Sequence, residues 1–464
     1  MLIRGCWHII GWKQCILAIW ICSILPIKAY AREADDAFPL PEPSLNSNTA
    51  EQNSNNTLSP LIPEPLDYGA DVIDSFASSP VGPVTDPNID SMPLLPEPEM
   101  QEVEMPKEAD NKLWRIRPFI KTGVTCDDNI FITNTNRTAD IIYNVKGGFA
   151  FEMGDYRDLY NNYVLLEYLA SGFFFTNHPA QNSLDQSYSL LAQYRITQLA
   201  IQLESSFQSL DGADRQVGAF TSRMLFFNAL RFVYAHSEKT NIDFEINQRT
   251  SSYPQQISSY TTEAQLGFDY EILPKVRVGL EGVAGINQVQ DSPNRLYQTL
   301  NGLVSYDIAE KLDLNASAGI QFNQYTSGGE PMRILPVFAV GLDYQLFPKT
   351  SFSLEAYRNM QASPSLQGQD YIATGLELGI TQRLAQKIAL GLALGYENDT
   401  YVANMESVKA SRVDNFYFIR PEISYSFLKY LDANLSYEYR TNESTMQQDS
   451  WFDNQVNFEL SLDF

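Results

Sequence analysis

The last nine residues of the chain alternate strictly between apolar and polar side chains. The apolar positions are Val456, Phe458, Leu460, Leu462 and Phe464. A period of two predicts a β-strand with one apolar and one polar face. Since this strand finishes on an aromatic residue, we expect it to close a barrel in a membrane, where no strand edge is left unpaired. An ordinary half-buried edge strand is the alternative.

The same two-residue period recurs from Leu113 onwards, and helical spacing explains none of it. In the segment that begins at Leu199, for example, apolar residues alternate with Ala, Gln and Glu. Counting such segments predicts about eighteen strands, with sixteen as the alternative. Their approximate ranges are 115–125, 139–153, 160–175, 185–196, 199–209, 221–235, 240–250, 260–271, 275–288, 296–308, 311–325, 332–345, 350–361, 370–382, 387–398, 412–426, 431–441 and 450–464.

Short and long connections alternate between these segments, which is typical of an antiparallel, up-and-down transmembrane β-barrel. Thr197-Gln198 and Leu273-Pro274 are short connections, whereas 126–138 and 399–411 are long and polar. A soluble sandwich or propeller is less suitable, because its strands usually have five or six residues. We therefore predict an all-β fold in which residues 113–464 form an outer-membrane barrel. An even strand number places both of its ends on the short-turn, periplasmic side.

Residues 1–31 are predicted to be a secretory signal peptide. Arg4 and Lys13 precede an apolar run over 16–27, and Ala29 and Ala31 give the small-residue pattern of a cleavage site. The apolar run is shorter than the roughly 20 residues of a membrane-spanning helix.

Residues 32–112 have a different composition. They hold 13 of the 24 prolines and 17 acidic residues against 3 basic ones. Such a segment buries too little apolar surface to fold, so we expect a disordered periplasmic segment. It repeats Pro-Glu-Pro three times, starting at Pro41, Pro63 and Pro96. The repeat is either a docking motif for a periplasmic partner or a stiff spacer.

The alternation also assigns many charged side chains to the barrel interior. A lipid-facing Arg or Lys at the membrane midplane would cost about 2–4 kcal/mol. These charges either line a water-filled pore or pair within a narrow or plugged interior, and a barrel of eighteen strands favours the pore. Arg358 is assigned inward by the same argument. The predicted pore-lining residues are Arg115, Arg117, Lys146, Arg195, Arg223, Arg231, Arg277, Glu281, Asp343, Glu377, Arg420 and Glu438.

Other kinds of chemistry find little support. The formal net charge of −24 does not suit nucleic acid. Cleavage of the signal would leave Cys126 as the only cysteine, so no cysteine-based metal site is expected. His178 and His236 fall on opposite sides of the predicted membrane, and we expect neither an enzyme nor a cofactor. Asp127 and Asp128 are a weak candidate for calcium, with a polar turn as the alternative.

The opening of the barrel resembles a known family. Arg117-Pro118-Phe119, then Cys126-Asp127-Asp128-Asn129-Ile130-Phe131, then Ala139-Asp140-Ile141 look like the start of the family named Putative beta-barrel porin 2. Cys126 stands where that family usually has Tyr. The resemblance implies an outer-membrane barrel with porin-like passage, or a role beside exopolysaccharide export.

Two functions remain open from the sequence. The first is a porin-like channel for small solutes or one associated with exopolysaccharide export. The second is a non-conducting anchor whose Pro-Glu-Pro segment docks a periplasmic partner. In either case the barrel would contact outer-membrane lipid, and its aromatic-ended last strand resembles the signal that the barrel-insertion machinery recognises.

Overall fold

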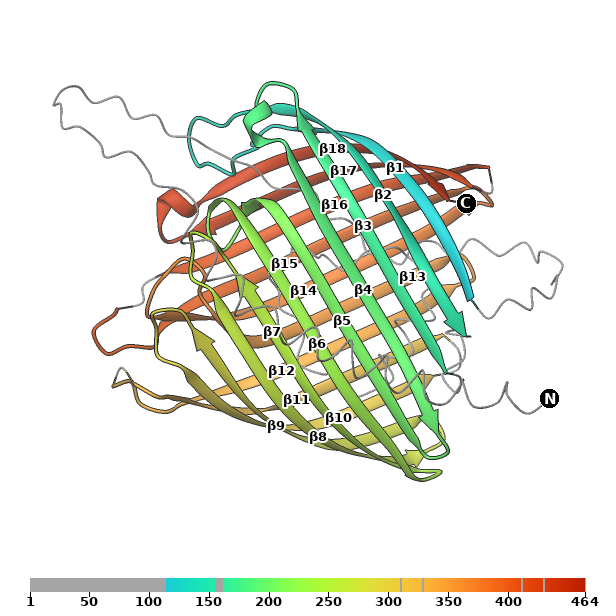
Figure 1. Ribbon diagram of the computed structural model, residues 1–464, viewed down its shortest axis with the longest axis vertical. Helices are drawn as coiled ribbons and strands as arrows, with labels where there is room; N and C mark the ends of the chain where they lie inside the picture. The colour runs from blue at the N-terminus through green and yellow to red at the C-terminus, as the bar shows by residue number, and fades with distance from the viewer. Residues whose placement is uncertain are drawn as a thin grey trace, which may run out of the picture. The chain divides into compact units, whose positions relative to one another are not determined.

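The computed structural model describes residues 114–154, 162–308, 311–327, 329–409, 412–428 and 430–463, and the predicted segments 1–31 and 32–112 lie outside these ranges. The described residues form one antiparallel sheet of eighteen strands (Figure 1). The strands are β1 (Trp114–Asp127), β2 (Asp140–Gly154), β3 (Tyr163–Phe175), β4 (Ser183–Ile196), β5 (Leu199–Asp214), β6 (Ala219–Ser237), β7 (Thr240–Ser252), β8 (Ser259–Leu273), β9 (Val276–Val289), β10 (Arg295–Ile308), β11 (Leu312–Tyr325), β12 (Arg333–Phe347), β13 (Thr350–Ala362), β14 (Gln369–Ala385), β15 (Ile388–Ala403), β16 (Val413–Leu428), β17 (Leu431–Ser444) and β18 (Trp451–Asp463).

The last strand pairs with the first and closes the sheet into a barrel. The β1–β18 ladder runs from Phe119 opposite Asp463 to Asp127 opposite Gln455. Every other strand pairs with its neighbours in the chain, so the prediction of a closed eighteen-stranded barrel is confirmed. On β18, Val456 and Phe458 face outwards with 45% and 43% of their surfaces exposed. Phe464, the last residue of the predicted closing pattern, lies outside the described residues.

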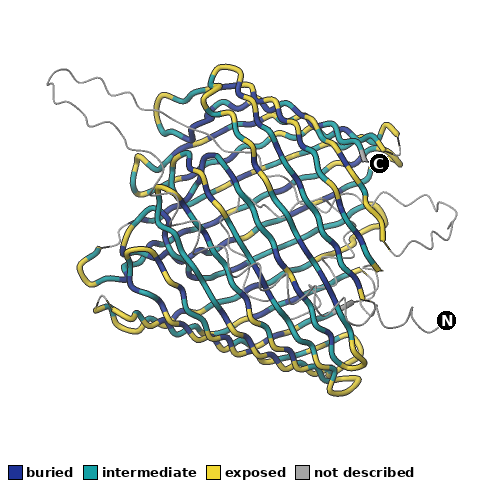
Figure 2. The backbone as a smooth tube through the Cα atoms, viewed as in Figure 1, coloured by how far each residue is buried: buried dark blue, intermediate teal, exposed yellow. Residues whose placement is uncertain are grey.

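Buried and exposed positions alternate along the strands (Figure 2). The exposed positions are largely apolar, and the inward positions carry the charges. On β2, for example, Ile141, Tyr143 and Val145 are exposed, whereas Asn144 and Lys146 are buried. This alternation is that of a barrel whose outer surface meets lipid. Exposed aromatic residues also mark the short-turn end, as expected for an interfacial girdle; they include Trp114, Tyr234, Tyr270, Tyr344, Phe347, Phe427 and Tyr430.

Short turns and longer loops alternate around most of the barrel as predicted, although the β5–β6 loop at the long-loop end has only four residues, 215–218. Residues 197–198, 274–275 and 348–349 each connect two strands at the short-turn end, whereas residues 128–139 and 404–409 belong to loops at the opposite, long-loop end. Two 3₁₀ helices, η1 (Pro179–Gln181) and η2 (Gln447–Asp449), lie in long loops. Among the described residues, no helix has the length and apolarity needed to cross a membrane.

Four inward-facing aromatic rings each lie over a glycine directly opposite on the neighbouring strand. At each of these glycines an added Cβ would collide with the ring. The glycines therefore let large side chains lie flat on the inner wall, an arrangement that also stabilises the glycine positions. The pairs are Phe119 with Gly148, Tyr297 with Gly285, Tyr357 with Gly375 and Phe418 with Gly395.

The barrel wall departs from a simple cylinder at β13. The ladder between β12 and β13 stops at Phe338 opposite Arg358, although β12 and β13 both continue beyond this pair. Arg358 lies on the outward-facing row with Phe338 and donates to Thr374 Oγ1 at 2.6 Å. Its inward assignment from the sequence was therefore wrong, because Arg358 is three positions from the inward-facing Glu355 and strict alternation places it on the other face.

Candidate functional site at the long-loop mouth

The tip of the β13–β14 hairpin (residues 359–373) lies inside the mouth of the barrel at the long-loop end. One face of this tip packs against the inner wall: Met360 and Ile372 form a buried cluster with Leu335 of β12. Arg295 of β10 also reaches the tip, with Nη2 donating to the Met360 carbonyl at 2.9 Å and Nη1 lying 3.5 Å from Asp370 Oδ2. These contacts hold the tip across the interior, because β10 and β14 are not neighbours in the sheet.

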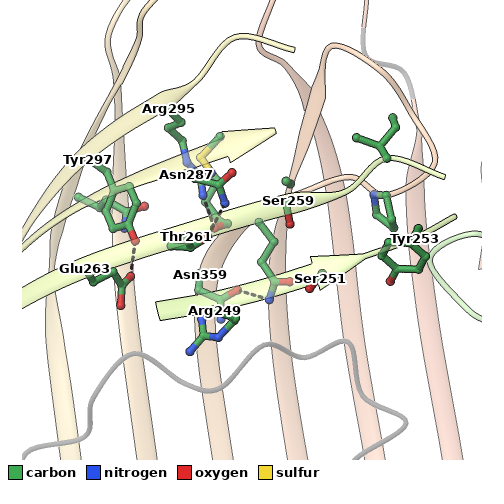
Figure 3. A pocket seen from close by; sticks show the side chains of 16 residues that line it. Arg249, Ser251, Tyr253, Ser259, Thr261, Glu263, Asn287, Arg295, Tyr297 and Asn359 are labelled. Atoms are coloured by element: carbon green, nitrogen blue, oxygen red, sulfur yellow. Dashed lines mark hydrogen bonds between the residues drawn. The ribbon is translucent and has the colours of Figure 1, made fainter. Parts of the chain in front are cut away.

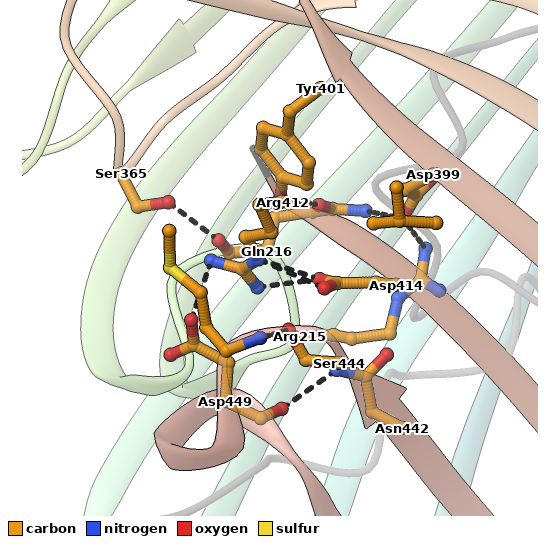
Figure 4. A network of polar contacts seen from close by, with 12 residues as sticks. Arg215, Gln216, Ser365, Asp399, Tyr401, Arg412, Asp414, Asn442, Ser444 and Asp449 are labelled. Carbon is orange, nitrogen blue, oxygen red and sulfur yellow. Dashed lines mark hydrogen bonds and ion pairs between the residues drawn. The ribbon is translucent and has the colours of Figure 1, made fainter. Parts of the chain in front are cut away.

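The other face of the tip meets the loop between β5 and β6, residues 215–218. Arg215 forms an ion pair with Glu397 of β15 and lies 3.4 Å from Asp399. Gln216 donates from Nε2 to Asp399 Oδ2 at 2.9 Å (Figure 4). The strands β6 and β15 are nine positions apart in a ring of eighteen, so these contacts join opposite walls of the barrel.

Gln216 accepts hydrogen bonds from the opposite wall at both its side chain and its backbone carbonyl. Tyr401 Oη donates to Gln216 Oε1 at 3.1 Å, and Ser365 Oγ, in the β13–β14 loop, donates to the Gln216 carbonyl at 2.9 Å (Figure 4). Tyr401 belongs to a buried cluster with Tyr357, Tyr371 and Ala373. We call Arg215, Gln216, Glu397, Asp399 and Tyr401 the mouth latch.

The charges of the mouth latch are compensated in a buried setting. The side chains of Arg215, Glu397 and Asp399 are 11%, 7% and 2% exposed. Burial alone would lower the pKa of the Arg215 guanidinium, but the Glu397 and Asp399 carboxylates beside it raise that pKa above its ordinary value. The guanidinium also lies 4.5 Å from the centre of the Phe416 ring. Arg215 is therefore the cation that offsets the charge of these two neighbouring carboxylates in the mouth.

A second group of charges joins the last two long loops beside the latch. Arg412 Nη2 lies 2.6 Å from Asp414 Oδ2, and Arg412 Nη1 lies 3.2 Å from Asp449 Oδ2 in η2. The Arg412 guanidinium also lies 4.8 Å from the Tyr401 ring centre. Burial raises the pKa of the Asp449 carboxyl above its usual value, although Arg412 opposes the shift. These contacts connect the β15–β16 and β17–β18 loops to the mouth latch (Figure 4).

All twelve residues predicted to line a pore occupy inward-facing rows of the ladder, and many of them are paired. Glu152 accepts from both Arg115 and Arg117, and Lys146 Nζ lies 2.7 Å from Glu459 Oε2. Their lining of a conducting pore stays a prediction. Three of the other predicted arginines also lie near a carboxylate: Arg223 is 3.0 Å from Asp214, Arg231 is 3.4 Å from Asp243, and Arg277 is 3.9 Å from Glu271. Glu281 accepts a hydrogen bond from Asn301 at 2.8 Å. The remaining predicted residues are spread over other inward rows: Arg195, Asp343, Glu377, Arg420 and Glu438.

The predicted residues do not converge on one site. The latch instead depends on Arg215, Gln216, Glu397, Asp399 and Tyr401, none of which the sequence pattern singled out. Arg215 and Gln216 lie in the four-residue connection between β5 and β6, and the alternation pattern predicts no more than an ordinary polar loop there. For Glu397 and Asp399, the one available sequence signal was the alternation along β15, which places odd-numbered residues on the inward face.

The weak calcium candidate is a hydrogen-bonded turn in the structure. The carboxylates of Asp127, Asp128 and Asp453 lie within 4.8 Å of one another. However, Asp127 accepts from the Asn129 backbone N–H at 2.8 Å and from Gln455 Nε2 at 2.9 Å, and Arg440 Nε donates to Asp453 at 2.8 Å. Donors therefore occupy most of these oxygens, Asp453 Oδ1 being the exception among the described residues, which favours the polar turn.

The two histidines lie at opposite ends of the barrel. His178, in the β3–β4 connection at the long-loop end, has Nδ1 2.7 Å from Asp140 Oδ2. His236 is the second-last residue of β6 and lies at the short-turn end.

Comparisons with known proteins agree with a barrel of porin type. The family named Putative beta-barrel porin 2 matches residues 336–464, so the resemblance predicted from the sequence is confirmed over these residues. The matched range does not include the opening motif around Cys126. A search of curated proteins finds no match.

Three solved structures illustrate the similarity. OccAB3 of Acinetobacter baumannii has a TM-score of 0.41 and 11% identity, with 75% of this chain and 99% of that chain covered. OpdQ of Pseudomonas aeruginosa has a TM-score of 0.42 and 10% identity, with coverage of 76% and 100%. The outer membrane protein OpdK of Pseudomonas aeruginosa has a TM-score of 0.41 and 11% identity, with coverage of 75% and 98%.

Proposed function

We propose that this porin-like outer-membrane barrel is a channel for small polar solutes and that its long-loop mouth opens and closes. The observation that carries the proposal is a difference in exposure along the interior. Of the inward-facing charges below the mouth, Glu204 and Asp343 are exposed, whereas Asp243 and Glu281 are buried like those of the latch. Below the mouth, water therefore has access to the part of the inner wall around these two carboxylates, as a channel requires.

The inner wall is predominantly acidic along β7, β8 and β9. Asp243, Glu245, Asp269 and Glu281 all face inwards there, and Arg231 lies 3.4 Å from one of them, Asp243. A pathway lined mainly by carboxylates attracts cations and repels anions. We therefore propose that the open channel passes cations and neutral solutes in preference to anions.

The test is conductance across a planar bilayer after reconstitution of the purified full chain. We expect stepwise openings with long closed intervals, and a reversal potential in a KCl gradient that favours K⁺ over Cl⁻. Anion preference would contradict the acidic-wall argument. A barrel that stays silent at all voltages, with its mouth latch intact or removed, would contradict a channel of any kind.

The filled mouth also favours a second candidate, a non-conducting anchor. In that case residues 32–112, with their Pro-Glu-Pro repeats, would dock a periplasmic partner while the barrel holds them at the membrane. If the transported solute were an exopolysaccharide, its passage would require the β13–β14 tip to leave the mouth altogether. Deletion of residues 32–112 separates the candidates, since a channel would keep its conductance and an anchor would lose its cellular role.

We expect the long loops to face the cell exterior and the short turns to face the periplasm. Ser407, in the β15–β16 loop, and Lys349, in the β12–β13 turn, are both exposed. In a Cys126→Ser background, Ser407→Cys is expected to react with a membrane-impermeant maleimide on intact cells, whereas Lys349→Cys reacts only after the outer membrane is permeabilised. The reverse order of labelling would show that the orientation is inverted, with residues 32–112 outside.

A further inference from the structure

A cavity lies between the β13–β14 tip and the inner wall formed by β7 to β10. It holds about 90 Å³, room for several water-sized groups. One side is formed by the wall residues Arg249, Thr261, Glu263 and Asn287, and the other by the tip (Figure 3). None of the residues that line the cavity belongs to the mouth latch or to the twelve pore-lining residues predicted from the sequence.

Buried polar atoms around this cavity lack hydrogen-bond partners among the described residues. They are the acceptors Glu263 Oε2, Asn287 Oδ1 and Gln321 Oε1 and the donor Arg295 Nε. The side chains are held in place by their other atoms: Tyr297 Oη donates to Glu263, and Asn287 Nδ2 donates to Thr261 Oγ1 at 2.9 Å (Figure 3). Glu263, Asn287 and Arg295 are 5%, 6% and 4% exposed. A buried polar atom without a hydrogen bond lowers the stability of the fold, so these atoms favour a ligand in the cavity that forms hydrogen bonds with them.

The charges that line the cavity nearly cancel. Arg295 lies 3.5 Å from Asp370, and Glu263 offsets Arg249, whose guanidinium lies over the Phe227 ring. A simple anion would leave the three acceptor oxygens without donors, and a simple cation would face two guanidinium groups. A hydroxyl group both donates and accepts, so a ligand with several hydroxyls satisfies both kinds of orphan atom. The cavity therefore favours a neutral ligand with many hydroxyls.

We propose that this cavity binds one sugar unit of a neutral saccharide, with the remainder of the ligand lying in the lumen. The proposal deepens the proposed channel function by naming a class of solute, and it rests on that function only for the role of the site. Tyr297 contributes the wall of the cavity, since its ring is fixed over Gly285 and directs the hydroxyl to Glu263. Aromatic faces of this kind are common in pockets that bind small polar molecules.

Calorimetric titration of the detergent-solubilised full chain with maltotriose, and separately with glucuronate, tests the site. We expect a saturable heat with maltotriose and a weaker response to glucuronate. Asn287→Leu should reduce the maltotriose affinity about tenfold, the effect of losing one well-placed hydrogen bond from a buried acceptor. Asn315→Leu is the matched control, because Asn315 is also an inward-facing, buried asparagine, 8% exposed, but lies outside the cavity. Gln321→Leu is a second test variant, and the heat-dependent gel mobility of each variant verifies that its barrel is folded.

Three results would overturn the proposal: no saturable heat with maltotriose, binding of glucuronate alone, or equal losses in the Asn287 and Asn315 variants. Failure of the channel function is a separate outcome. A barrel that binds maltotriose but never conducts keeps the site and loses the channel, whereas a conducting barrel without maltotriose binding keeps the channel and loses the site.

Discussion

Replacement of Arg215 by alanine is expected to raise the ratio of open to closed channels by about a hundredfold or more. In the closed mouth, this change leaves Glu397 and Asp399 buried side by side without their cation. Breaking a buried ion pair by removing one partner costs roughly 3–5 kcal/mol, and every 1.4 kcal/mol is a factor of ten in an equilibrium. The penalty applies to the closed mouth, because a displaced loop would leave both carboxylates in water.

Single-channel recording in planar bilayers measures this effect as open probability. Arg277→Ala is the matched control: Arg277 also faces inwards, but it lies at the short-turn end, is 45% exposed and comes no nearer than 3.9 Å to Glu271. Its loss should change open probability little, since exposed ion pairs contribute about 0–1 kcal/mol. Equal open probabilities in the wild type and Arg215→Ala would show that the latch does not control the mouth.

The period of two was sufficient to predict the barrel, because lipid imposes the same constraint on every strand. A strand that carries Ile141, Tyr143 and Val145 on one face and Asn144 and Lys146 on the other has a single favourable orientation between lipid and water. The pairing of β1 with β18 then follows, since an open sheet would leave an unpaired edge in hydrocarbon. Strand number and closure therefore depend on a local signal that repeats along the chain.

The tip of the β13–β14 hairpin was not predictable from that signal. Met360 and Ile372 occupy rows that alternation assigns to lipid, yet both are buried against Leu335 of the inner wall. An apolar side chain is equally satisfied by lipid and by another protein surface, so the pattern does not distinguish a lipid-facing strand from one that has bent into the lumen. The misassignment of Arg358 has a different origin, because Arg358 shares the outward row of Phe338 and strict alternation would have placed it there.

The inward charges were predictable one at a time, but their pairing was not. Lys146 and Glu459 are 313 residues apart in the chain and form a 2.7 Å ion pair across the barrel seam. Which inward charges share a height depends on the stagger between strands, and that stagger is a property of the closed sheet. The mouth latch was even less predictable, because its contacts depend on where a four-residue loop lies relative to a strand of the opposite wall.

Glu459 is expected to be the most important single carboxylate for the stability of the barrel seam. It lies on β18, 2.7 Å from Lys146 of β2 and 3.7 Å from Lys121 of β1, and all three side chains are nearly buried. Glu459→Gln would remove the carboxylate that lies beside two buried ammonium groups and is expected to destabilise the barrel by about 3–5 kcal/mol. Urea unfolding in lipid vesicles, followed by gel mobility, measures the change.

Glu355→Gln is the matched control, and its expected effect has the opposite sign. Glu355 also faces inwards, but its direct partner across the ladder is another carboxylate, Glu377. Like charges opposite each other destabilise a sheet, so neutralising one should leave stability unchanged or raise it slightly. Adding Lys146→Met to Glu459→Gln should recover part of the loss, because one of the two ammonium groups that lay beside the Glu459 carboxylate is then gone. Equal destabilisation by Glu459→Gln and Glu355→Gln would show that the seam depends on backbone pairing and outward apolar contacts rather than on its buried charges.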